Sequence, residues 1–132
     1  MKVHRILIVF PLGLLATSFF FDLAWMLHRS DQLALVAWWM IFAGVCGGAA
    51  AALFGVIDFL GIPRGTRARR MGALHGGGMG VVAMLYAASW LLRRDAPAAP
   101  ESIAILLSGL GVLLTVVTGW LGGELADRME ET

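Results

Sequence analysis

Long apolar stretches dominate the chain, and most of the charged residues fall in short clusters between them. Four stretches are long enough to cross a bilayer, and they cover residues 6–27, 33–62, 71–92 and 102–123. A spanning helix needs about 20 consecutive, mainly apolar residues. The stretches are apolar on all sides and lack the alternating segments of about ten residues that are typical of a membrane barrel. The pattern therefore predicts an all-α integral membrane bundle of four transmembrane helices.

These predicted helices leave little chain for anything else. We expect a single transmembrane domain over residues 1–132, with helices at about 6–28, 33–62, 70–93 and 102–126. The connections are too short for a separate catalytic or nucleic-acid-binding module. The composition agrees, because 59% of the residues are hydrophobic and only 14% are charged, against about a quarter charged in a soluble domain. The expected environment is the lipid bilayer, and the net charge of +1 indicates no nucleic-acid partner.

Basic residues divide unevenly between the two predicted sides of the membrane. One side receives Lys2, Arg5, Arg64, Arg67, Arg69, Arg70 and Arg128, and the other receives Arg29, Arg93 and Arg94. By the positive-inside rule, the side with more Lys and Arg faces the cytoplasm. The predicted topology therefore places both termini in the cytoplasm, in a bacterial inner membrane.

Glycine and other small residues recur at helical spacing in three of the four stretches. The three sets are Gly44, Gly48 and Ala52; Gly72, Gly76 and Gly80; and Gly111, Thr115, Gly119 and Gly123. Helices in lipid associate through close contact of small residues, so these sets predict one compact bundle. We assign structural roles to Gly55, Gly76, Gly122 and Gly123. The run 76–78 further indicates that a neighbouring helix or a flat ligand approaches the backbone there.

Ionisable residues within or beside the apolar stretches are candidates for a functional site, because charge is costly in lipid. Asp58 and His75 lie inside the second and third stretches, whereas Glu124 directly follows the fourth and His4 precedes the first by two residues. With the predicted topology, all four lie at the cytoplasmic ends of their helices. We therefore expect one polar layer at that end of the bundle.

Asp22 lies apart from this layer, near the predicted outer end of the first helix. Paired carboxylates inside a membrane are often structural ion pairs. We expect Asp22 to be structural, either as a cap or as a partner of Arg29, Arg93 or Arg94.

The first interpretation of the polar layer is a hydrogen-bonded cluster. In it, Arg67, Arg69 or Arg70 would pair with Asp58 and Glu124. This interpretation, which we favour, describes a non-enzymatic membrane subunit that holds the bundle together or docks a partner. The partner would be a second copy of the chain or another membrane subunit.

The second interpretation is a cofactor or ion site. Histidine is a common ligand of haem and of transition metals, and cores of helical bundles host such sites. His4 and His75 would ligate a b-type haem in a redox protein that exchanges electrons with quinone. As a further alternative, His4, His75, Asp58 and Glu124 would hold a divalent metal in an ion-binding, transporter-like protein. No metal or haem spacing signature selects between these alternatives.

Several motifs resemble those of one known family. They are His4 with the segment FPLGLL at 10–15, Asp22-Leu23, ALFGVIDFL at 52–60, the basic segment 66–70 followed by His75, and GWLGGEL at 119–125. Together they resemble the bacterial family of predicted membrane proteins catalogued as domain of unknown function 2231. The likeness runs nearly from end to end. It implies a four-helix inner-membrane protein and brings no established activity.

The chain departs from this family at its opening motif, His-Pro-x-x-x-His-x-Pro. His4 and Pro11 match the motif, whereas Arg5 replaces its first proline and Val9 replaces its second histidine. A family function that needs both histidines would be altered in this chain.

Overall fold

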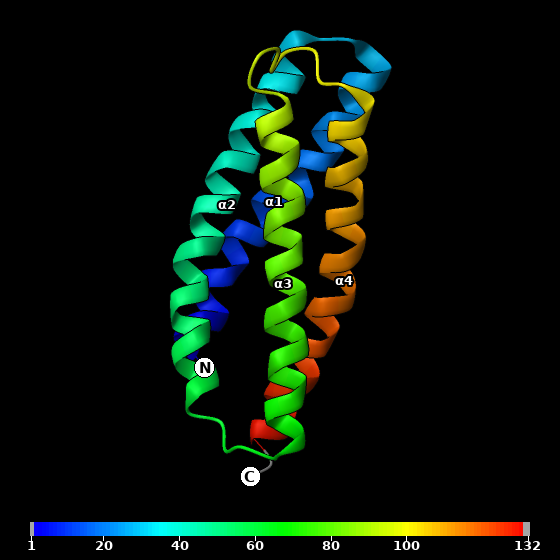
Figure 1. Cartoon of the computed structure of the whole chain (residues 1–132). Helices are drawn as coiled ribbons and strands as arrows, with labels where there is room; N and C mark the ends of the chain where they lie inside the picture. The colour runs from blue at the N-terminus through cyan, green and yellow to red at the C-terminus, as the bar shows by residue number, and fades with distance from the viewer. Residues whose placement is uncertain (1, 131–132) are drawn as a thin grey trace.

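The structure is a computed structural model that describes residues 2–130, and it consists of four long α-helices (Figure 1). They are α1 (Lys2–His28), α2 (Asp31–Leu60), α3 (Arg67–Leu92) and α4 (Ser102–Glu130). All four are long and apolar enough to cross a membrane. The described residues contain no strand. The prediction of an all-α bundle with four candidate spans is confirmed.

The helices begin and end for local reasons. α1 ends where Arg29 takes a left-handed backbone conformation with a φ of 52°. The side chain of Thr66 caps α3 by accepting a hydrogen bond from the backbone N–H of Arg69 at 3.1 Å. α1 begins at Lys2, earlier than the apolar stretch alone predicts, and it therefore includes His4. A helix can continue through polar residues beyond the apolar core of a bilayer, so its ends extend past its hydrophobic stretch.

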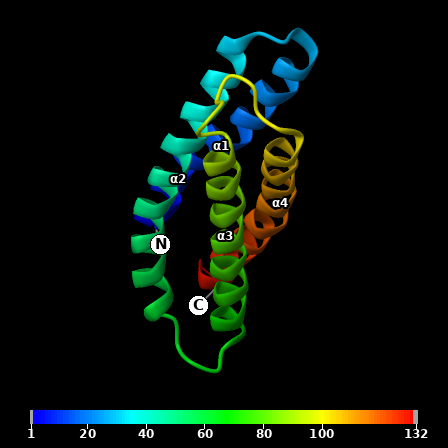
Figure 2. The same ribbon diagram turned by 45° about the horizontal axis from the view of Figure 1, so that its top comes forward.

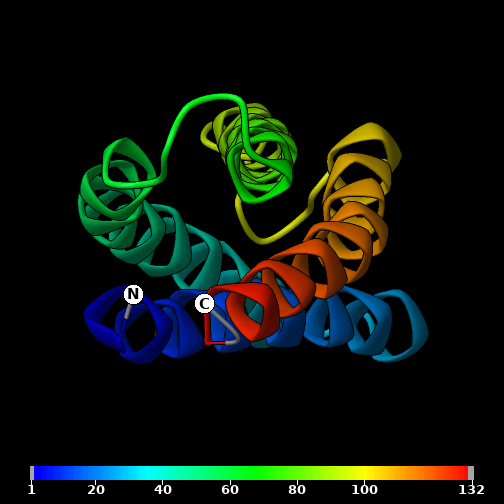
Figure 3. The same ribbon diagram turned by 90° about the horizontal axis from the view of Figure 1, so that it is seen from below.

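The helices form two antiparallel hairpins, α1–α2 and α3–α4, which stand side by side (Figures 1 and 2). In the view along the bundle, α1 lies opposite α3 (Figure 3). Both termini and the α2–α3 connection lie at one end, which we call the lower end after its place in Figure 1. The α1–α2 and α3–α4 connections lie at the upper end.

Small residues let the helices of each hairpin approach closely. A Cβ atom added at Gly44 on α2 would lie 2.7 Å from the side chain of Leu15 on α1. In the second hairpin, a Cβ atom added at Gly111 on α4 would lie 2.7 Å from the ring of Tyr86 on α3. Glycine therefore provides the space for a larger side chain of the facing helix, as expected for helices that pack in lipid.

The two hairpins repeat the same arrangement of residues. Equivalent positions on α1 and on α3 with its C-cap residue are His4 and His75, Pro11 and Val82, Leu15 and Tyr86, Ser18 and Ser89, and Asp22 and Arg93. Equivalent positions on α2 and α4 are Ala37 and Ala104, Gly44 and Gly111, Ala51 and Thr118, and Gly55 and Gly122. Both residues of each pair fall in the same burial class. Because both hairpins begin at the lower end, this is a parallel repeat with an approximate two-fold relation.

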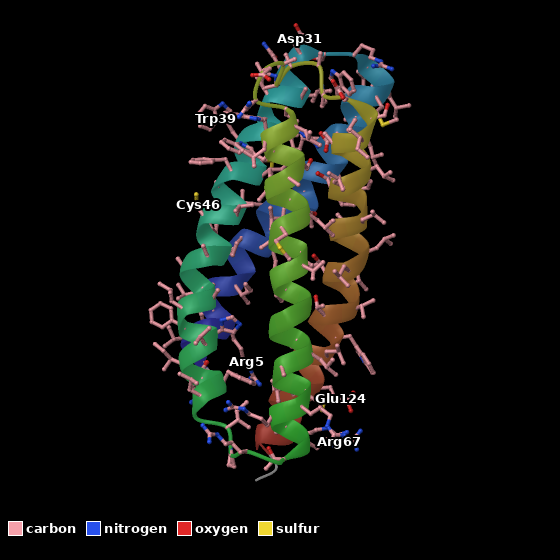
Figure 4. All side chains as sticks on the ribbon, viewed as in Figure 1. Arg5, Asp31, Trp39, Cys46, Arg67 and Glu124 are labelled. Carbon is pink, nitrogen blue, oxygen red and sulfur yellow. The ribbon has the colours of Figure 1, made fainter. Side chains whose placement is uncertain are left out.

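The outward faces of the bundle are apolar. Large side chains such as Leu53, Ile57, Leu113 and Val116 are more than half exposed. Trp39 and Cys46 also point outward from α2 (Figure 4). An exposed apolar surface of this extent suits a lipid environment and would be a liability in water.

Candidate functional site

Two histidines face each other near the lower end of the bundle. The ring centroids of His4 and His75 are 6.5 Å apart, and the ring planes are nearly perpendicular, at 84°. His4 comes from the first hairpin and His75 from the second, and both side chains are partly buried. The structure thus brings together the two histidines that the sequence marks as candidate ligands.

A backbone carbonyl of the same hairpin orients each histidine ring. His4 Nδ1 lies 2.9 Å from the Ala51 carbonyl oxygen, and His75 Nδ1 lies 2.7 Å from that of Thr118. A carbonyl oxygen can only accept a hydrogen bond, so Nδ1 is the donor in both rings. In the neutral ring Nε2 then carries the lone pair. This is the common tautomer of a ligating histidine, whose other nitrogen donates to a carbonyl.

Each ring also rests on a glycine one helical turn beyond the carbonyl that it contacts. A Cβ atom added at Gly55 would lie 3.0 Å from Cε1 of His4. One added at Gly122 would lie 2.7 Å from Cε1 of His75. A methyl group at either position would push the ring away from its carbonyl. The structural roles expected for Gly55 and Gly122 are therefore to seat the two histidines.

The spacing of the two rings suits one metal ion between them. A metal–imidazole bond measures about 2.0–2.1 Å, and the ring nitrogen lies about 1.1 Å from the ring centroid. Two histidines on opposite sides of one metal therefore place their centroids about 6.3 Å apart. The observed 6.5 Å between the His4 and His75 centroids is close to that value, and with the 84° interplanar angle it is also that of an edge-to-face ring contact, for which centroids lie about 4.5–7 Å apart.

The four-residue metal site that was one of the alternatives does not form. Among the described residues, no group of three or more His, Cys, Asp or Glu side chains could hold a metal ion. Glu124 instead accepts a hydrogen bond at 2.8 Å from Arg128, one turn along the same helix. Asp58 is partly buried and has an interaction of its own. A site with only two histidines fits a metal that brings its other ligands, as iron does in haem.

The arginines in the first turn of α3 divide into exposed and partly buried residues. Arg67 and Arg70 are exposed, and Figure 4 shows Arg67 with Glu124 at the lower end. Arg69 turns inward, where Nη1 donates to the carbonyl oxygens of Phe59 at 2.6 Å and Ile62 at 3.0 Å. Its guanidinium also lies 3.9 Å from the centre of the Phe59 ring. Arg69 thus binds the carbonyl end of α2, where a cation is favoured.

The glycine run 76–78 has two different environments. Gly78 packs directly against Thr118 of α4, which is the neighbouring-helix contact expected for this run. A Cβ atom added at Gly76 or Gly77 would meet no atom of the chain within 4 Å. The same holds at Gly123. Gly76 and Gly123 are therefore exposed on the outer surface of the bundle.

Asp22 forms a fully buried ion pair in the upper half of the bundle. Arg93 donates from Nη1 to Asp22 Oδ1 at 2.6 Å and from Nη2 to Oδ2 at 2.8 Å. Both side chains have 0% exposure. Of the three arginines considered as partners, Arg29 instead lies over the ring of Trp25, and Arg94 lies 3.7 Å from the exposed Asp95.

Four helices that can each cross a membrane, around a histidine pair and a buried ion pair, define a small multi-pass membrane protein. The chain belongs to the family of predicted membrane proteins designated DUF2231, which matches it over residues 1–131. The family resemblance of the sequence motifs is confirmed. No curated protein and no solved structure matches the chain.

Proposed function

We propose that this protein binds one b-type haem between its two hairpins, and that His4 and His75 would hold its iron. The observation that carries the proposal is the contact between the two histidine rings, whose centroids are 6.5 Å apart and whose Nδ1 atoms are each hydrogen-bonded to a backbone carbonyl, so that Nε2 of each ring would be the ligating atom. When bound, haem supplies one-electron redox chemistry. The proposed role is electron transfer within the membrane.

The protein residues around the pair hold and orient the ligands. Ala51 and Thr118 fix the tautomer and rotation of the rings through their carbonyls. Gly55 and Gly122 supply the space that each ring needs against the neighbouring helix. Because each ring belongs to a different hairpin, occupancy of the site would also join the two hairpins.

The visible spectrum of the purified protein, expressed with ample haem, tests this proposal. We expect the bands of a six-coordinate, low-spin b-type haem, and we expect their loss in His4→Ala and in His75→Ala. The nearly perpendicular rings should also give the strongly anisotropic low-spin ferric EPR signal that crossed axial imidazoles produce. His28→Ala is the matched control, because His28 is exposed at the end of α1 and should leave both spectra unchanged. A colourless protein would refute the proposal.

A second candidate function is a non-enzymatic membrane subunit in which the histidines link helices. The two histidine–carbonyl hydrogen bonds favour it, because each already connects two helices of a hairpin. In that case the protein would be colourless, and His4→Ala and His75→Ala would lower its thermal stability. A second copy or another membrane subunit would then dock on the bundle.

We also propose a topology in which the lower end faces the cytoplasm of a bacterial inner membrane. The cluster of four arginines at residues 64–70, in the α2–α3 connection and the first turn of α3, supports it. Single cysteines placed at 64–70 in a Cys46→Ser background should be labelled only after the membrane is permeabilised. Labelling from outside intact spheroplasts would reverse the topology.

A further inference from the structure

The internal repeat places equivalent residues of α1 and α3 against each other. His4 lies beside its equivalent His75. The Tyr86 hydroxyl donates to the carbonyl oxygen of its equivalent Leu15 at 3.1 Å. Further up, Asp22 pairs with its equivalent Arg93. Contacts between equivalent residues are what an approximate two-fold relation produces near its axis.

One equivalent pair differs from the others, because its two residues carry opposite charges. Identical or uncharged residues occupy the other equivalent buried positions, such as Ser18 and Ser89 or Gly44 and Gly111. Two copies of the first hairpin would bring Asp22 against a second Asp22. Two copies of the second hairpin would bring Arg93 against a second Arg93. Both side chains are completely buried, where like charges without partners are strongly unfavourable.

We propose that Asp22 and Arg93 act as a pairing key that joins the first hairpin to the second and excludes like-with-like pairing. Exclusion by buried like charges is a common means of partner selection. The key also fixes the depth at which α1 lies against α3 and thereby sets His4 opposite His75. The functional value of placing His4 opposite His75 rests on the proposed haem function. The selection of hairpins stands on the ion pair and the repeat.

The hydrogen-bond partners around Asp22 and Arg93 determine how well the two residues can be swapped between their positions. Arg93 also donates to Ser89 Oγ at 3.1 Å and to Ser108 Oγ at 3.2 Å. Ser18, one turn before Asp22, is the equivalent of Ser89, so an arginine at position 22 would find the same hydroxyl. The equivalent of Ser108 is the buried Ile41, which offers no acceptor. Exchange of the charges should therefore restore pairing in part, and Ile41→Ser should restore more.

The first experiment measures thermal unfolding of full-length variants in detergent. Asp22→Arg places two arginines together, and we expect the unfolding midpoint to fall by about 10 °C or more. Asp22→Arg with Arg93→Asp should recover part of that loss, and addition of Ile41→Ser should recover more. An exchanged protein no more stable than Asp22→Arg alone, or Asp22→Arg as stable as the wild type, would overturn the pairing key.

A second variant distinguishes an effect on the choice of hairpin partner from an effect on stability. Asp22→Leu with Arg93→Leu removes both charges, a replacement that often preserves folding. We expect this protein to remain folded and to gain a dimer, detected by chemical cross-linking as the protein-to-detergent ratio rises. A folded protein that stays monomeric at every ratio would overturn the selective role. Haem spectra of the same samples report separately on the histidine pair, so failure of the haem proposal would not be mistaken for failure of the key.

Discussion

The lower and upper ends of the bundle use equivalent positions of the repeat in opposite ways. At the lower end, both equivalent positions hold histidine, and the two rings contact each other while each Nδ1 is hydrogen-bonded to a carbonyl of its own hairpin. At the upper end, the equivalent positions hold Asp22 and Arg93, whose complementary groups satisfy each other and are completely buried. In the proposed function the lower pair binds a ligand, whereas the upper pair is held together by its own opposite charges. One fold thus provides a site and a structural pair on the same helices.

The largest effect should come from disrupting the upper pair on one side only. Asp22→Leu leaves Arg93 buried without its carboxylate, and removal of one partner of such a pair costs about 3–5 kcal/mol. We expect a large fall in the free energy of unfolding, measured by thermal or denaturant unfolding in detergent. Asp95→Leu is the control, because Asp95 is exposed beside Arg94 and should have no measurable effect. Equal stability of the two variants would remove the structural role assigned to the upper pair.

Gly122, which packs against the ring of His75, should be the next most sensitive position. Gly122→Ala places a methyl group 2.7 Å from Cε1 of the ring and should displace His75 from the Thr118 carbonyl. Loss of such an orienting contact weakens metal binding by about 10–100-fold. Gly123→Ala is the matched control, since its methyl group would meet no atom within 4 Å. Haem titration of both variants checks the prediction, and unchanged affinity in Gly122→Ala would contradict it.

Gly55→Ala should have a smaller effect than Gly122→Ala. Its methyl group would lie 3.0 Å from Cε1 of His4, so the ring needs to move less. We expect weaker haem binding that lies between those of Gly122→Ala and the wild type. A larger loss of haem affinity in Gly55→Ala than in Gly122→Ala would contradict this ranking of the two glycines.

The smallest effect concerns the connection at the lower end. Arg69→Ala removes two hydrogen bonds to the carbonyl end of α2 and the contact with Phe59. Because Arg69 is only partly buried, we expect a loss of about 1 kcal/mol in unfolding free energy. Arg70→Ala, an exposed neighbour, is the control and should behave as the wild type. The same stability for both variants would contradict the role of Arg69.

The sequence predicts the four spans because bilayer thickness imposes a length and a polarity that can be counted directly. It also marks His75, because ionisable residues are rare inside apolar stretches, and His4, which precedes the first stretch by two residues. Their meeting depends on how two hairpins pack, which no local pattern contains. Glu124 pairs within its own helix. α4 continues beyond its apolar stretch, so Arg128 lies one turn away and satisfies the carboxylate locally.

The repeat was also hidden in the sequence, for a physical reason. The equivalent pairs Leu15 with Tyr86 and Asp22 with Arg93 share burial and position but not chemistry. At the 71-residue spacing of the repeat, the identical residues of α1 and α3 include His4 with His75, Leu14 with Leu85, Ala16 with Ala87, and Ser18 with Ser89. The constant spacing between these identical residues was the available signal. This spacing indicates a repeat only when the structure shows that the residues between the identical ones also share their burial.

The most direct test of the central claim is a titration of haem into the purified, haem-free protein, followed in the visible spectrum. We expect the wild type to saturate at one haem per chain with low-spin b-type bands. His28→Ala should do the same, whereas the double variant His4→Ala and His75→Ala should show no low-spin species. Saturable low-spin binding that survives in the double variant, or no binding by the wild type, would contradict the assignment of the histidine pair.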